Sequence, residues 1–91
     1  MNLDEAITSV KSRPAAYVLL SGDGAYRYKG SCRNLVDRLK DHQAGRVSKT
    51  KNRRPLRLLH FEYFENYTDA RKRELYFKSG AGREWLKRRY P

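Results

Sequence analysis

Short apolar blocks, separated by glycine, proline and polar stretches, divide the chain into alternating helices and strands. Apolar residues at helical spacing predict a first helix over 3–10. Pro14 ends this helix, because proline disfavours helical backbone in the residue before it. The unbroken apolar run that follows predicts a strand over 15–21, covered on both faces and therefore central in its sheet.

A hairpin is predicted directly after this strand. Asp23-Gly24 is a strong signal for a two-residue turn, and residues 25–30 then form the second strand. Arg27 and Lys29 share one face of that strand, which is typical of an edge strand partly open to solvent.

The middle of the chain predicts a helix, a loop and a third strand. Asn34 is suited to cap a helix that ends just before Gly45. Residues 46–55 form a basic loop, and residues 56–64 form the third strand. The stronger apolar face of that strand carries Leu59, Phe61 and Tyr63.

Two further helices complete the pattern. Thr68 can cap a helix that runs to about Ser79, and the glycines at 80 and 82 break it before a short final helix. The order of elements predicts a single mixed α+β domain over residues 1–91, built around a small antiparallel sheet.

Charge changes the picture more than any other feature of the composition. The chain has 21 Lys and Arg against 10 Asp and Glu, a net charge of +11. Such an excess indicates a polyanionic partner, with nucleic acid ahead of an acidic membrane. No apolar run approaches the length of a membrane span, and the first residues do not resemble a signal peptide. A lone Cys32 can form neither an internal disulfide nor a cysteine zinc site, so a reducing cytoplasm is expected.

The hairpin brings two phenols together. A two-residue turn pairs Tyr17 with Gly30, and side-chain alternation then places Tyr17 and Tyr28 on the same face. Gly30 leaves open space beside the Tyr17 hydroxyl. Taken alone, such a pair is more often simple core packing.

A guanidinium and an imidazole follow on the next helix. Arg38 and His42 are four residues apart and therefore share one face of the helix. Leu35 lies three residues before Arg38, so this face adjoins the apolar stripe that is expected to be buried. A cation beside an apolar seam needs a partner, and a phosphate is one candidate. A solvated arginine whose stem covers the core is the alternative.

A carboxylate lies inside an apolar stripe of the fourth predicted helix. Ala70, Glu74 and Phe77 fall on one helical face. A buried carboxylate needs a metal ion or a cation beside it. An internal salt bridge, for instance with Arg38, is the structural alternative.

Together these side chains suit phosphodiester cleavage. A carboxylate can hold Mg²⁺, arginine can neutralise the phosphate, and a phenol or an imidazole can move protons. Nearby cations such as Arg38 would favour the phenolate form that a tyrosine base requires.

The order of these residues resembles the GIY-YIG nuclease family, in particular its small stand-alone bacterial and archaeal members. Ala15-Ala16-Tyr17 occupies the position of the first family motif, and Tyr28-Lys29-Gly30 that of the second. The resemblance covers roughly residues 14–89. It implies a three-stranded antiparallel sheet and one divalent ion, Mg²⁺ or Mn²⁺, on the glutamate. It also implies that the scissile phosphate is surrounded by Tyr17, Tyr28, Arg38 and His42.

The sequence departs from the family pattern at three places. The first motif has Ala-Ala for Gly-Ile, and the second has Lys29 where an apolar residue is usual. Repair and homing-type relatives also carry an asparagine beyond the glutamate helix, and no asparagine follows Asn66 here.

The leading interpretation is a metal-dependent DNA endonuclease that nicks its substrate or cuts branched structures with low sequence specificity. A non-catalytic nucleic-acid-binding module and an RNA-directed nuclease are the alternatives. No small-molecule cofactor is expected, and a protein partner could supply targeting. His60 is expected to be structural or solvated. The cations expected to grip phosphates are Lys29, Lys49, Lys51, Arg53 and Arg54.

Overall fold

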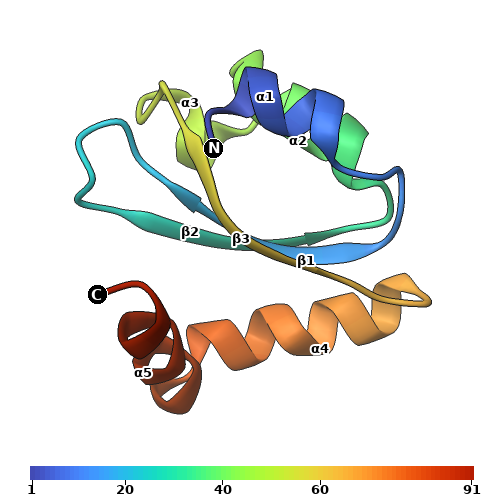
Figure 1. The fold of residues 1–91 in the computed structure, drawn as a ribbon, viewed down its shortest axis with the longest axis vertical. Helices are drawn as coiled ribbons and strands as arrows, with labels where there is room; N and C mark the ends of the chain where they lie inside the picture. Colours follow the sequence, from blue (N-terminus) through green and yellow to red (C-terminus); the bar gives the residue numbers. More distant parts are fainter.

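The computed structural model describes residues 1–91 and shows a three-stranded antiparallel sheet with helices on both faces (Figure 1). The strands are β1 (Ala15–Leu20), β2 (Arg27–Cys32) and β3 (Arg57–Tyr63), in the spatial order β2-β1-β3. β1 is therefore the central strand and β2 an edge strand, as their apolar and basic patterns predict. The α+β class expected from the sequence is confirmed.

The helices divide between the two faces of the sheet (Figure 1). α1 (Leu3–Ser9) and α2 (Leu35–Gln43) cover one face, and α4 (Tyr67–Lys78) and α5 (Gly80–Arg89) cover the other. The basic stretch expected to be a loop contains one helical turn, α3 (Ser48–Lys51). None of these helices combines the length and the apolar character that crossing a bilayer requires.

β1 separates two apolar clusters. Tyr17 and Leu19 belong to the larger cluster, with α1 and α2, while Ala16 and Val18 belong to the smaller one, with α4 and α5. All four side chains are fully buried. This explains why the strand shows no alternation in its sequence: each face of it meets a core.

The β1–β2 register is the one predicted, although the turn is not. Tyr17 lies opposite Gly30. The turn, however, is centred one residue earlier than Asp23-Gly24, because the Gly24 N–H donates to the Ser21 carbonyl at 2.9 Å. Gly22 donates its N–H to the Arg53 carbonyl at 3.0 Å instead of pairing within the hairpin.

A β-bulge changes the faces of β3. The β1–β3 register shifts between Val18 and Leu19, which makes Leu59 the extra residue. Leu59 therefore packs with the α4/α5 cluster, whereas Phe61 and Tyr63 pack with the opposite one. The expectation that the three share a face is wrong for Leu59.

The boundaries of α4 and α5 also differ from the prediction. Asn66, not Thr68, caps α4, and its side chain accepts from the Asp69 N–H. Ser79 ends α4 and caps α5, with its hydroxyl accepting from the Gly82 N–H at 3.1 Å. The glycines thus lie in the first turn of the last helix, and Gly82 lets that helix approach α4 closely.

Replacing Gly82 with alanine should be costly, because a Cβ there would lie 1.8 Å from the Tyr76 carbonyl oxygen. We expect Gly82→Ala to lower the free energy of unfolding by about 2 to 3 kcal/mol in urea titration. Gly80→Ala is the matched control, since a Cβ there meets nothing within 4 Å. Equal losses from the two variants would contradict the close α4–α5 packing.

Candidate active site

Two tyrosines meet over the bare backbone of Gly30. A Cβ at this position would lie 2.5 Å from the Tyr17 hydroxyl oxygen and 2.9 Å from the ring of Tyr28. The two rings lie 6.2 Å apart between centroids. Tyr17 is fully buried and Tyr28 half-buried, so only Tyr28 presents its phenol towards solvent. The predicted pairing of the phenols on one face is therefore observed.

His42 lies behind Tyr17, in the core. Its Nε2 is 2.7 Å from the Tyr17 hydroxyl oxygen and its Nδ1 is 2.8 Å from the hydroxyl of Thr50. The imidazole is fully buried, so the expectation that it lies within direct reach of a phosphate is wrong. Burial first, and the charge of Arg38 second, lower the pKa of His42 to about 4. The ring is therefore neutral near pH 7.

Arg38 lies next to both phenols, at the mouth of the site. Its side chain is 37% exposed and forms a loose ion pair with Asp41 at 3.7 Å. Burial raises the pKa of Tyr17 well above its usual range, and the nearby Tyr28 adds to this, while Arg38 opposes it only in part. The expected stabilisation of a phenolate by Arg38 is thus outweighed at Tyr17, which stays protonated.

Glu74 is held on the other face of the sheet. Its side chain is 8% exposed. One carboxylate oxygen accepts from the Ser31 hydroxyl at 2.5 Å, and the other lies 2.6 Å from both Arg71 and Lys78. The internal salt bridge considered for Glu74 is therefore present, but Arg38 is the wrong partner, because both cations come from α4 itself. Burial acts to raise the pKa of Glu74, but these hydrogen bonds outweigh it and keep the pKa below its usual range.

Any metal ion here would rest on a single carboxylate. No three His, Cys, Asp or Glu side chains lie together in the structure. Glu74 fits one hard cation, because it is ionised and Ser31 fixes its orientation. Lys78 and Arg71 are each 45% exposed, so either can leave the carboxylate for solvent at low cost.

The edge position of β2 connects the two halves of the site. Ser31, which contacts Glu74, directly follows Gly30, on which the tyrosines pack. The two groups lie on opposite faces of the strand. No further strand pairs beyond β2, so a ligand lying along this edge can be reached from both faces.

A basic groove of about 280 Å³ runs along this edge. It contains no acidic residue. Burial, followed by the charges of Arg83, Arg27 and Lys78, lowers the pKa of Lys29, which shows how much positive charge gathers there. The groove is lined by Tyr26, Arg27, Tyr28, Lys29, Lys49, Lys78 and Arg83.

The groove contains residues that the sequence analysis missed. Lys78 and Arg83 are not among the predicted phosphate contacts, because their place in the groove depends on how α4 and α5 pack against β2. Lys78 lies four residues after Glu74 and therefore on the same face of the helix. This spacing is the only feature of the sequence that could have predicted its role.

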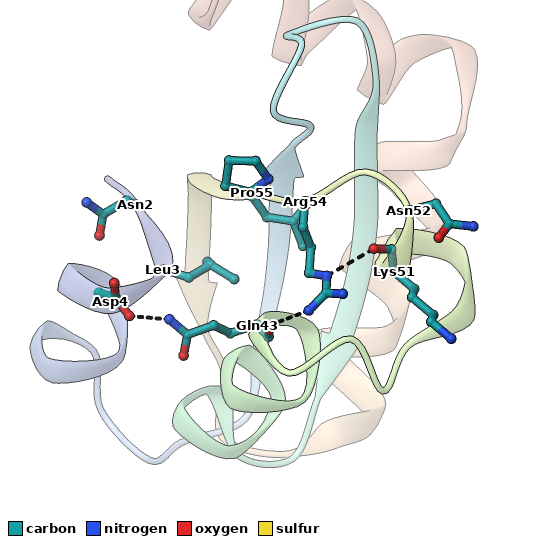
Figure 2. A pocket seen from close by; sticks show the side chains of 9 residues that line it. Asn2, Leu3, Asp4, Gln43, Lys51, Asn52, Arg54 and Pro55 are labelled. Atoms are coloured by element: carbon teal, nitrogen blue, oxygen red, sulfur yellow. Dashed lines mark hydrogen bonds between the residues drawn. The ribbon is translucent and has the colours of Figure 1, made fainter.

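The four cations of the basic stretch do not act alike. Lys49 lines the groove, whereas Lys51 lines the separate cavity drawn in Figure 2. The Arg53 guanidinium lies 4.0 Å from the centre of the Tyr26 ring, and Arg54 donates to the carbonyls of Lys51 and Gln43 (Figure 2). Arg54 therefore holds the ends of α2 and α3 in place. The cavity of about 500 Å³ beside it in Figure 2 contains neither tyrosine of the site.

His60 is structural, as expected. Its Nδ1 is 2.7 Å from the Tyr90 hydroxyl and its Nε2 is 2.7 Å from the Glu62 carboxylate. Glu62 in turn accepts from Arg73. This network anchors the end of α5 to β3, on the face of the sheet opposite to the tyrosines.

The low pKa of His42 predicts a pH-dependent stability. The unfolded chain binds a proton near pH 6.5, whereas the folded one binds it only near pH 4. Stability is therefore complete above pH 6.5 and falls by about 3 kcal/mol as the pH drops to 4. The free energy of unfolding, measured by urea titration between pH 6.5 and pH 4, should therefore fall by about 3 kcal/mol more in the wild type than in His42→Gln. Parallel curves would contradict the buried neutral imidazole.

Comparison with known proteins agrees with this geometry. A UPF0213 protein of Listeria monocytogenes serotype 4b is 43% identical over 63 residues, which cover 68% of this chain and 70% of the relative. A UPF0213 protein of Pediococcus acidilactici is 39% identical over 74 residues, covering 78% of this chain and 74% of the relative. No solved structure matches the chain significantly. The family model of the GIY-YIG catalytic domain matches residues 14–88, and the chain therefore belongs to the GIY-YIG nuclease family.

Proposed function

We propose that this chain is a metal-dependent endonuclease that hydrolyses phosphodiester bonds in DNA, with residues 1–91 acting as one domain. The observation that carries the proposal is the edge of β2, where the half-buried phenol of Tyr28, the Arg38 guanidinium and the basic groove converge. Low sequence specificity and nicking or structure-directed cutting are part of the proposal. The groove supports this preference, because its lysines and arginines suit phosphates and no Asn, Gln, Asp or Glu lines it to discriminate further among bases.

Each side chain has a distinct role in the proposed reaction. Hydrolysis forms a bond from a water oxygen to phosphorus and breaks the ester bond, while the water loses a proton and the leaving oxygen gains one. Arg38 balances the charge of the phosphate. Tyr28 is the phenol that solvent and substrate can reach, so it orients the attacking water. Tyr17 and His42 are positioning residues behind it, since both are fully buried.

Glu74 is the proposed ligand of one Mg²⁺ or Mn²⁺ ion. When bound, such an ion would supply positive charge to the phosphate and lower the pKa of a bound water. Mg²⁺ is often held by one carboxylate with waters and substrate phosphate oxygens. Lys78 both pairs with Glu74 and lines the groove, so a phosphate that attracts Lys78 would free the carboxylate for the ion.

A non-catalytic nucleic-acid-binding module is the second candidate function. The full engagement of Glu74 by Ser31, Arg71 and Lys78 favours it, because these contacts satisfy the carboxylate without a metal. A cleavage assay in the presence of Mg²⁺ or Mn²⁺ distinguishes the two candidates. Its labelled substrates are nicked, flapped, forked and linear DNA, with matched RNA. Cleavage of DNA supports the proposal, and binding without cleavage of any substrate favours the module.

Glu74→Gln should abolish nicking and leave the fold nearly unchanged. Glutamine can still accept from Ser31, and the released Arg71 and Lys78 are solvated, so we expect a loss of about 1 kcal/mol or less. DNA affinity should stay the same or rise, because an anion near the phosphate has gone. Nicking rate, binding and melting temperature are measured on the same sample.

Glu84→Gln is the control for this change. It removes an exposed carboxylate that pairs with Arg88 at the same i, i+4 spacing, far from Ser31. A folded Glu74→Gln protein that nicks at the wild-type rate would show that Glu74 does not hold the ion.

The groove should contribute directly to the salt dependence of DNA binding. Removing two phosphate contacts with Lys29→Ala and Arg83→Ala should reduce the slope of log affinity against log salt by up to about 2. A protein with Lys40→Ala and Lys87→Ala loses the same charge outside the groove. Equal reductions in the two double variants would mean that only net charge matters.

A further inference from the structure

Thr50 is a fully buried polar residue inside the most basic segment of the chain. It lies on α3, next to Lys49, but its hydroxyl points into the core. The Thr50 oxygen is 2.8 Å from His42 Nδ1 and 3.4 Å from the Val47 carbonyl oxygen. The proposed chemistry does not use this residue, and a valine would fill the same space without its hydroxyl.

The contacts of Thr50 favour one direction for its hydrogen bonds. A carbonyl can only accept, so the Thr50 hydroxyl donates its one hydrogen to Val47. The Thr50 oxygen then accepts from His42, which places the imidazole proton on Nδ1. A neutral imidazole with a proton on Nδ1 has a free lone pair on Nε2. Nε2 therefore accepts the hydroxyl hydrogen of Tyr17.

We infer that Thr50 is a positioning residue that fixes the His42 tautomer and, through it, the direction of the Tyr17 hydroxyl. With its hydrogen directed inward to His42, Tyr17 turns the lone pairs of its oxygen outward, towards Arg38. The guanidinium is thereby held at the mouth of the site. The effect on reaction rate rests on the proposed function, whereas the tautomer does not.

The opposite tautomer would undo this arrangement. A proton on Nε2 would be donated to Tyr17, whose own hydrogen would then point outward, at the positive guanidinium. A second residue that sets which imidazole nitrogen carries the proton is a common device in sites that use histidine.

Nitrogen-15 NMR of the two histidine rings at pH 7 tests the tautomer directly and needs no substrate. His42→Gln assigns the signals, since His60 is the only other histidine. We expect the wild-type His42 ring to carry its proton on Nδ1. A proton on Nε2 in the wild type would overturn the inference, even if the proposed nuclease activity were established.

Two substitutions then test the role of the hydroxyl. Thr50→Val keeps the shape and removes the hydroxyl, so it should increase the Nε2-protonated form and slow cleavage by about 10- to 100-fold with little change in KM. Thr50→Ser keeps the hydroxyl, so it should retain the Nδ1-protonated tautomer of His42 and the wild-type rate of cleavage. An unchanged tautomer in Thr50→Val, or a Thr50→Ser protein that behaves like Thr50→Val, would overturn the inference.

Discussion

The contact between the Tyr17 side chain and the backbone of Gly30 is the constraint on which the site depends. Only a residue without a Cβ leaves room for the phenol at this point of β2. The antiparallel register then determines the rest, because it places Tyr28 on the same face. From this fixed position the Tyr17 hydroxyl reaches His42 on α2, and Arg38 lies one helical turn before His42.

The second constraint is that the site surrounds the edge of a sheet. Tyrosines on one face and a carboxylate on the other would be separated by backbone in a central strand. At an edge they can serve one ligand. The positive charges along β2 fit this arrangement, since they also discourage another strand from pairing there. In the proposed function the same side chains, Arg27 and Lys29 among them, would both bind the substrate and protect the edge.

The parts of the site that depend on local spacing were predictable from the sequence. The pairing of Tyr17 with Gly30 was correct although the turn lies one residue earlier, because Ser21 still pairs with Tyr26, as a turn at Asp23-Gly24 also requires. The buried position of Glu74 followed from helical periodicity. What could not be predicted depends on how helices dock. Arg83 reaches the groove only because α5 folds back on α4, and Thr50 reaches His42 only because α3 turns inward.

The central claim is that Glu74 and the tyrosines form one site across the edge of β2. Paramagnetic broadening by Mn²⁺ in NMR spectra of the protein bound to an uncleavable DNA tests it most directly. The account predicts that the amides of Gly30 and Ser31 and the ring of Tyr28 broaden together, and that Glu74→Gln removes the effect. Broadening confined to another surface, or unchanged in Glu74→Gln, would contradict it.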